Sequence, residues 1–449
     1  MNCYKAHFVS IIDSIYKFIP LLIIPHFLSL TLFFAVLTLS FLNFRREALL
    51  IKKDEVVLIR GIIRQEKITI KKEKICTISF KKPWYYRPFK TAYLKMDTIA
   101  GSKKDENIKI ALNEKSAEKI LTLFEKTPAT QYSPKLSYIM VLCAVLSNSF
   151  AGMVIVSTAI SQSGDILGKT IEKELFGTLT TLSQTLSFGI PPAAAVIAYA
   201  IVFGYLIAFF INVLRYRHFT LSRNSQTIMV KGGALTHRAY SFKVKQINFL
   251  TLRQSIATKL LRFYSVFVNC SGFGKKSQDL SALVPAVKKR DLEKTLKMLT
   301  PELTPEKVTL KPHFFSVLKF VCAPLYPLIA IPLLSYVLIK LYPIFSDFIG
   351  FVAVTGMIVS GWFLIVRILD FLTSGIGYND KNITLKYSKG FSLLTVVIPR
   401  EKINRVVIRQ SIFQRTDNIC DVFIYTRGED KIKHHVKNVN LDKLKGILK

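Results

Sequence analysis

The sequence predicts membrane α-helical hairpins combined with α+β modules: a two-helix transmembrane hairpin followed by a small β-rich domain with a C-terminal helix, three times over. Three observations predict this fold. The chain has long uncharged apolar runs, its positive charge is collected between them, and the charged segments repeat a pattern of short strands. The chain is 50% hydrophobic and has a formal net charge of +34, and both values are accounted for if the apolar and the charged residues lie in different segments.

Four apolar runs are long enough to cross a bilayer. They are residues 136–160, 190–214, 320–339 and 348–366, and none contains a charged side chain. About 20 apolar residues in a helix span the hydrocarbon layer. The runs therefore predict a second hairpin over 136–214, with an outer loop at 161–189, and a third hairpin over 314–369.

The first apolar region is shorter. Residues 18–44 are almost continuously apolar, which suffices for one span but not for two. Residues 5–10 resemble residues 311–316, which open the third hairpin. This similarity favours a shortened hairpin over 8–44, with a single crossing as the alternative.

The distribution of Lys and Arg predicts the orientation. Segments 45–126, 215–300 and 370–449 are rich in both, whereas the links within the second and third hairpins carry little net charge. Because basic loops stay on the cytoplasmic side, we expect a multi-pass cell-membrane protein with its N-terminus and soluble domains in the cytoplasm. The nearest polyanion is then the anionic inner leaflet, which makes membrane lipid a better partner than nucleic acid.

The three basic segments contain equivalent strands. Alternating β-branched runs recur at 57–61, 68–70 and 73–78, at 228–232, 239–244 and 245–255, and at 383–386, 394–400 and 401–411. Each segment closes with a short amphipathic helix, at 114–124, 291–299 and 440–448. This pattern predicts a small bent sheet or open barrel with a helix packed across one opening.

The third segment carries a recognisable run, namely Ile398-Pro399, Lys402-Ile403, Val406 to Ser411 and Gln414-Arg415. The second matches it over 245–255, whereas the first departs from it at 80–87. Together with the preceding hairpins, these motifs resemble the bacterial pleckstrin-homology (PH) domain membrane proteins with bPH2 domains, and the threefold form is similar to the YdbT-like group. The resemblance implies three PH-like domains and a protein partner, such as a smaller PH-domain membrane relative.

Two equivalent triplets are candidate headgroup or partner-binding sites. They are Arg253, Gln254 and Ser255, and Arg409, Gln410 and Ser411. Each Arg is suited to an anionic headgroup, with Gln and Ser donors beside it. The alternative, which we favour, is that Gln and Ser bind the backbone of a turn and set its shape.

A basic and aromatic segment in the first domain is a third candidate. It contains Lys82, Trp84 and Arg87. Amphipathic rings beside Lys and Arg are typical of an interfacial membrane anchor, and a solvated loop with a few buried rings is the alternative.

Catalytic and metal-binding patterns find little support. The pair His434-His435 has no neighbouring cluster of ligands, so we expect no enzyme activity, metal or cofactor. The sequence thus favours a non-enzymatic membrane scaffold whose domains bind protein partners or anionic lipid, in envelope maintenance or protection. The alternative is a transporter or exporter working through the helices, with a cavity lined by Ser147, Asn148, Ser149, Ser183, Gln184 and Thr185.

Overall fold

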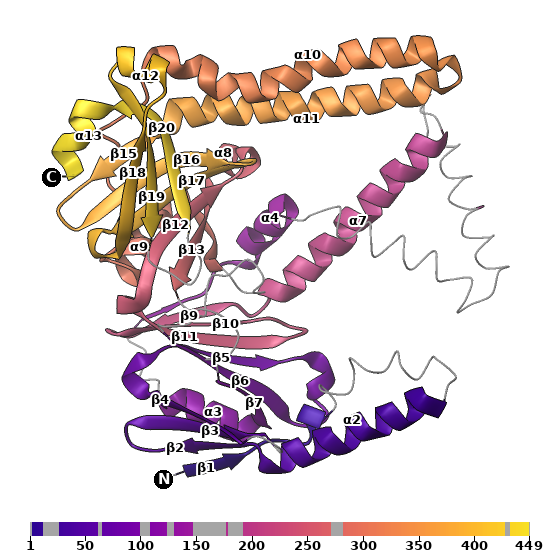
Figure 1. Ribbon diagram of the computed structural model, residues 1–449, viewed down its shortest axis with the longest axis vertical. Helices are drawn as coiled ribbons and strands as arrows, with labels where there is room; N and C mark the ends of the chain where they lie inside the picture. Colours follow the sequence, from indigo (N-terminus) through magenta and orange to yellow (C-terminus); the bar gives the residue numbers. More distant parts are fainter. Residues whose placement is uncertain are drawn as a thin grey trace.

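The computed structural model describes residues 2–11, 27–61, 65–98, 108–123, 130–146, 177, 192–270, 282–426 and 432–448. Figure 1 shows β-sheets stacked along one side of the molecule. Four helices extend from the same side of this stack: α2 (Phe27–Arg46), α7 (Pro192–Tyr216), α10 (Val317–Leu341) and α11 (Ser346–Thr373). The stack therefore has a helix-bearing side.

The strands form three modules of the same design. The first contains β2 (Ala48–Ile51), β3 (Glu55–Arg60), β4 (Glu66–Lys71), β5 (Ile75–Lys82), β6 (Thr91–Thr98), β7 (Ile108–Asn113) and α3 (Glu114–Leu123). The second contains β9 (Thr220–Arg223), β10 (Thr227–Gly232), β11 (His237–Lys243), β12 (Ile247–Gln254), α8 (Ile256–Leu260), β13 (Phe263–Cys270), β14 (Ala282–Lys288) and α9 (Lys289–Leu299). The third contains β15 (Gly375–Tyr378), β16 (Asn382–Lys389), β17 (Ser392–Pro399), β18 (Ile403–Arg409), α12 (Ile412–Thr416), β19 (Ile419–Thr426), β20 (Lys433–Asn440) and α13 (Leu441–Leu448).

Each module consists of two antiparallel half-sheets joined by one turn of 3-10 helix. These turns are Lys72–Lys74, Val244–Gln246 and Arg400–Lys402. Each module has its own cluster of buried apolar residues, to which strands of both half-sheets contribute. The alternation of the sequence buries one face of each strand against that core. The predicted β-rich repeat is thus present three times.

The first and third closing helices begin where the sequence predicts, whereas α9 begins at Lys289, two residues before its expected start. Asn113 Oδ1 accepts a hydrogen bond from the Lys115 amide at 3.2 Å, and Asn440 Oδ1 accepts one from the Lys443 amide at 3.1 Å. These side chains satisfy amides that the first turn of a helix leaves without an intrahelical partner.

Strands also pair across the module boundaries. The second half-sheet of the first module joins the second module through β5 and β11, in a sheet ordered β7-β6-β5-β11-β10-β9-β8 with β8 at Thr130–Tyr132. In the same way, β12 joins β17 in a sheet ordered β14-β13-β12-β17-β16-β15. The sequence predicts a separate small sheet or barrel for each module, and the structure adds these shared sheets. Pairing covers backbone groups that an edge strand leaves exposed.

Of the predicted hairpins, the structure describes the third most completely. Val317–Leu341 and Pro343–Thr373 are the two described helices that are long and apolar enough to cross a membrane. Of the second hairpin, the structure describes α4 (Leu136–Leu146) and α7, and most of the predicted outer loop lies outside the described residues. Residues 12–26 of the first hairpin also lie outside them, so the number of crossings there stays a prediction.

Candidate functional site: a basic pocket at the end of the third hairpin

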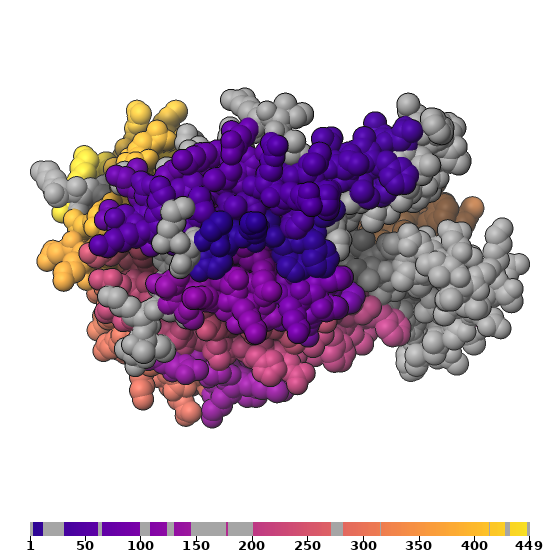
Figure 2. Space-filling view, turned by 90° about the horizontal axis from the view of Figure 1, so that it is seen from below, coloured from indigo at the N-terminus to yellow at the C-terminus, as the bar shows by residue number. Residues whose placement is uncertain are grey.

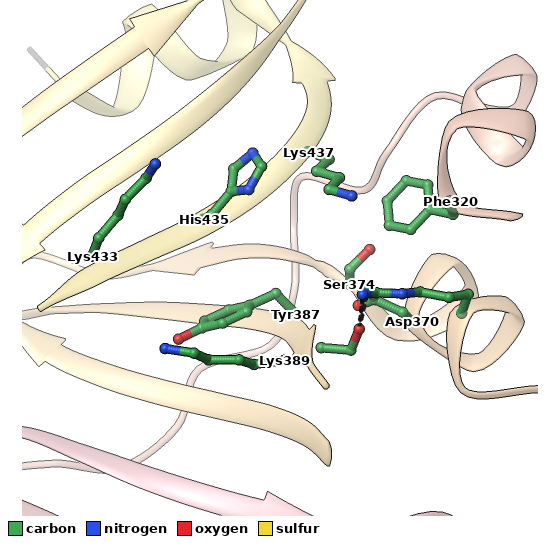
Figure 3. A pocket seen from close by; sticks show the side chains of 10 residues that line it. Phe320, Asp370, Ser374, Tyr387, Lys389, Lys433, His435 and Lys437 are labelled. Carbon is green, nitrogen blue, oxygen red and sulfur yellow. Dashed lines mark hydrogen bonds and ion pairs between the residues drawn. The ribbon is translucent and has the colours of Figure 1, made fainter. Parts of the chain in front are cut away.

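A pocket of about 190 Å³ lies where the third hairpin meets its module. Its walls come from the start of α10, the end of α11, β16 and β20 (Figure 3). The lining residues are Phe320, Arg367, Asp370, Ser374, Tyr387, Ser388, Lys389, Lys433, His435 and Lys437. The opposite end of the hairpin is the link around Tyr342, so the pocket lies at the module end of both helices.

Strand alternation brings three of these side chains together. Lys433, His435 and Lys437 occupy every second position of β20, and Figure 3 shows them along one side of the strand. Side chains two residues apart in a strand share a face. The intervening His434 and Val436 are buried on the other face. The sequence Lys-His-His-Val-Lys therefore forms a basic row above the pocket.

The charge of the pocket is positive. Four cationic side chains and one carboxylate line it, which leaves a net charge of +3 without counting His435. The carboxylate of Asp370 lies 3.5 Å from Arg367 Nη1 and accepts a hydrogen bond from Ser388 Oγ at 2.7 Å. Arg367 Nη1 also donates to Ser388 Oγ at 2.8 Å. Arg367 and Asp370 thus compensate each other, and three lysines supply the excess charge.

Aromatic rings hold two of these lysines. Lys437 Nζ lies 5.5 Å from the centre of the Phe320 ring, and Lys433 Nζ lies 4.0 Å from that of Phe423. The ring of His435 stacks on the same Phe423 ring, with 4.2 Å between their centres. Cation–π contacts of this kind orient the ammonium groups without neutralising them.

Buried polar atoms at the pocket lack partners. Asp370 and Ser374 are 3% and 2% exposed, and Asp370 Oδ1 and Ser374 Oγ have no hydrogen-bond partner among the described residues. Such atoms each cost about 1–3 kcal/mol when unsatisfied. A polar ligand with its own donors and acceptors would satisfy them. The pocket thus combines cations, a hydroxyl and a carboxylate in the manner of a site for a phosphate that carries hydroxyl groups.

A larger cavity lies between the second and third modules. It has a volume of about 920 Å³, and its charged lining comprises four cations and three carboxylates: Lys243, Lys245, Lys381, Arg400, Glu302, Asp380 and Glu401. These charges nearly cancel, so this cavity has little preference for an anion over a neutral ligand.

Comparison with known proteins identifies the modules. A family model described as Bacterial PH domain matches residues 15–126, 175–302 and 323–448. The chain belongs to the bacterial PH domain family. Each matched stretch contains one β-rich module and extends into the apolar segment before it. This agrees with the predicted bPH2 repeat.

One curated relative supports a membrane location for this bacterial PH protein. The UPF0699 transmembrane protein YdbT of Bacillus subtilis (strain 168) is 23% identical over 308 residues, which cover 62% of this chain. The match spans about 60% of the length of that relative. No solved structure matches the chain.

The predicted triplets of the bacterial PH modules form turns. Ser255 and Ser411 begin α8 and α12, and each makes a reciprocal capping box with Thr258 or Gln414. Gln254 Nε2 donates to the Phe263 carbonyl at 2.9 Å, and Gln410 Nε2 donates to the Ile419 carbonyl at 2.8 Å. These equivalent bonds match the turn-shaping alternative, because all four side chains are engaged with nearby backbone.

The two arginines of these triplets differ in their surroundings. Arg253 Nε donates to Ser392 Oγ of the next module at 2.9 Å. Arg409 lies at the end of β18, which pairs only with β19 among the described strands, and its guanidinium lies 5.2 Å from the centre of the Phe423 ring. Neither arginine lines the basic pocket. Binding of a headgroup by either remains a prediction.

The predicted anchor of the first bacterial PH module separates into paired and exposed residues. Lys82 forms an ion pair with Glu114, and Arg87 donates to the Ala234 carbonyl. The Ala234 amide in turn donates to the Leu214 carbonyl at 2.9 Å, near the end of α7. Trp84 is 62% exposed. The structure thus places an exposed indole in a segment that is linked through Ala234 to the module end of an apolar helix.

Sequence reasoning did not find the basic pocket. The alternation of Lys433, His435 and Lys437 was an available signal, but His434-His435 was considered only as a metal motif. The other walls come from Phe320, Asp370 and Lys389, which lie far from this strand in the sequence. No local pattern connects them.

Proposed function

We propose that this protein is a non-enzymatic membrane scaffold whose third bacterial PH module holds the phosphate of an anionic phospholipid in the basic pocket. The single observation that carries the proposal is the row of Lys433, His435 and Lys437 facing Lys389 at the module end of the third hairpin. A pocket at that depth meets the headgroup layer if the hairpin crosses the bilayer. Lys and Arg next to a span attract anionic lipid at about 1 kcal/mol each.

Exposed apolar side chains support contact with the same membrane surface. In each module, the segment after β5, β12 or β18 contains an exposed apolar side chain. Trp84 is 62% exposed, Leu260 is 82% exposed and Ile412 is 80% exposed. All three lie in the short helix that follows this strand, Trp84 and Ile412 at its first position and Leu260 at its last. Apolar side chains beside basic ones are what an interfacial anchor requires.

Hydrogen bonds and packing connect these segments to the helices. Arg87 donates to the carbonyl of Ala234, the Ala234 amide donates to Leu214 of α7, and α8 contacts α4. In the third module, Gln414 Nε2 of α12 donates to Asn438 Oδ1 at 2.7 Å, and Lys319 Nζ of α10 donates to the same atom at 3.4 Å. We infer that the helix-bearing side of the stack faces the inner leaflet.

The lipid proposal is tested with purified full-length protein in mild detergent. Binding of phosphatidylglycerol and of phosphatidylcholine is measured by native mass spectrometry for the wild type and for Lys433→Gln with Lys437→Gln. Loss of two lysines should weaken phosphatidylglycerol binding about thirtyfold, from roughly 1 kcal/mol for each cation. Phosphatidylcholine binding should change little.

A matched variant controls for the loss of charge. Lys294→Gln with Lys297→Gln removes two exposed lysines from α9, away from the pocket. Equal weakening by both double variants would show that only net charge matters and would overturn the pocket. If inorganic phosphate bound the pocket as tightly as phosphatidylglycerol and displaced it, the site would be assigned to a free anion instead.

The transporter alternative receives no support from the described helices. The residues expected to line its cavity, Ser147 to Ser149 and Ser183 to Thr185, lie outside the described residues.

A further inference from the structure

The two contacts between successive modules use the same strand register. In the first, Ile78, Ser79, Phe80 and Lys81 face Ser241, Tyr240, Ala239 and Arg238. In the second, Leu250, Thr251, Leu252 and Arg253 face Val397, Val396, Thr395 and Leu394. Counted from the isoleucine that follows each 3-10 turn, Ile75, Ile247 or Ile403, these pairs occupy identical positions. A strand of one module therefore recognises the next module in one fixed way.

The third module presents the same strand with one edge unpaired among the described strands. Among the described strands, β18 pairs only with β19 and forms the edge of its sheet. Ile408 of β18 is 37% exposed, whereas its equivalents Phe80 and Leu252 are each 3% exposed. Arg405 is also exposed, whereas its equivalents Thr77 and Phe249 are buried. The edge of β18 thus exposes residue positions that are buried in β5 and β12, where those strands pair with β11 and β17.

The first module presents the complementary edge. Its β4 is equivalent to β11 and β17, and among the described strands it pairs only with β3. Ile70 is the one fully buried residue of β4, whereas β11 buries five consecutive residues, Arg238 to Phe242. Figure 2 looks onto this end of the stack, where indigo and purple residues of the first module form the near surface.

We propose that β18 of one molecule pairs with β4 of a second copy of this chain, antiparallel and in the register of the two internal contacts. The expected partners are Val406 with Thr69, Val407 with Ile68, Ile408 with Lys67, and Arg409 with Glu66. The last pair joins opposite charges across the strands, and Glu66 also forms an ion pair with Arg60 of its own module at 2.7 Å. In the first internal contact the equivalent pair, Lys81 and Arg238, has like charges and is nevertheless formed.

Charged residues on both edges are the main argument against pairing, since proteins often place Lys or Arg on an edge strand to prevent it. However, β5 contains Lys81 and Lys82 and β12 contains Arg253, and both strands are paired. Basic residues at these positions thus do not block this contact. The exposed edges match it in register and in charge.

The membrane side of the molecule is compatible with end-to-end assembly. The same contact, used twice within the chain, leaves α2, α7, α10 and α11 on one side of the stack (Figure 1). The same contact between two molecules would relate their modules by the same rotation and translation. The helices of the second copy would therefore remain on that side. Because β18 and β4 are different surfaces, the assembly is head-to-tail and extends along the membrane.

Cysteine crosslinking in membranes tests the register. Two differently tagged full-length copies are co-expressed, one with Val407→Cys and the other with Ile68→Cys, after the exposed Cys3 and Cys322 are replaced by Ser. Facing residues on paired strands lie about 4.5–5.5 Å apart at Cα, within disulfide range. Mild oxidation should therefore join the two tagged copies.

A shifted pair controls for random collision. Lys71→Cys in place of Ile68→Cys moves the thiol about 10 Å along β4, beyond disulfide range, and should abolish the crosslink. Equal crosslinking of both pairs, or only monomer with both, would overturn the proposal. A Val407→Cys copy that joins preferentially to another Val407→Cys copy would indicate a symmetric pair and would overturn it as well.

The charge pair supplies an independent readout. Arg409→Glu should lower the crosslinked fraction about fivefold. Glu66→Arg on the other copy, made together with Arg60→Glu to keep the ion pair within that copy, should restore it. Arg290→Glu makes the same charge change on exposed α9 and should have no effect. Loss with Arg290→Glu equal to that with Arg409→Glu would assign the effect to net charge and reject the strand contact. Lipid binding by the basic pocket is measured separately, so either proposal can fail alone.

Discussion

At the residue scale, burial decides the charge of His434. This side chain is 2% exposed, its Nδ1 lies 2.9 Å from the Tyr387 hydroxyl, and its ring meets the Phe249 ring edge-on at 4.8 Å. Phe249 belongs to β12, so the histidine lies in the contact between the second and third modules. Burial, together with the nearby Lys389, lowers the pKa of His434 to about 4. The imidazole is therefore neutral at pH 7.

This burial predicts a loss of stability in mild acid. His434 binds a proton near pH 6.5 in the unfolded chain but only near pH 4 in the folded chain. The contribution of the neutral imidazole to the free energy of unfolding is therefore fully present above pH 6.5 and is lost as the pH falls between these values. At pH 5 the loss is about 2 kcal/mol. Thermal unfolding of the full-length protein at pH 7.5 and pH 5 should show it, and His434→Asn should reduce the difference. A reduction of the same size with His237→Asn, on the exposed end of β11, would contradict this assignment.

At the element scale, Gly356 of α11 lies against Ile331 of α10. A Cβ added at Gly356 would lie 3.0 Å from Ile331 Cδ1, whereas one added at Gly361 meets nothing within 4 Å. Small residues allow close approach of helices in a membrane, where packing rather than the hydrophobic effect drives association. The same hairpin accommodates Pro324, Pro327 and Pro332 inside a continuous α10. Its stability thus depends on the contact with α11.

A matched pair of substitutions tests this contact. Gly356→Ile should destabilise the third hairpin by about 1–3 kcal/mol through overpacking, and Gly361→Ile should have little effect. The measurement is the midpoint of thermal unfolding of the purified full-length protein in mild detergent. Equal shifts for the two variants would contradict a specific contact at Gly356.

At the scale of the whole molecule, the modules form a continuous array in which each contacts its neighbour through paired strands. Stability in such arrays is the sum of the modules and the contacts between neighbours. The array also fixes which side of every module bears helices (Figure 1). One orientation in the membrane therefore applies to all three modules together.

This arrangement predicts the accessibility of two single cysteines in intact cells. Tyr342→Cys, in the exposed link of the third hairpin, should react with a membrane-impermeant maleimide, because the positive charge of the modules predicts that they lie on the cytoplasmic side. Lys294→Cys, exposed on α9 of the second module, should react only after permeabilisation. Labelling of Lys294→Cys from outside would reverse the orientation. Native Cys3 and Cys322 are replaced by Ser in both variants.

The sequence alone determined the repeated strands, the closing helices and the third hairpin. The apolar run at 320–339 lies within α10, and the expected helices at 291–299 and 440–448 nearly coincide with α9 and α13. The turn role of Ser255 and Ser411 was also predictable. These features depend on residue patterns within one or two turns of helix or along one strand, and such patterns are visible in a linear chain.

Only the tertiary structure decided which edges are covered and where the basic pocket lies. Arg253 and Arg409 occupy the same motif, yet one bonds to the next module and the other lies at an open edge. The pocket brings Phe320, Asp370 and Lys437 together from distant parts of the chain. Both outcomes depend on how modules and helices are placed relative to one another. That placement is set by the packing of surfaces far apart in the sequence, which the local periodicity does not encode.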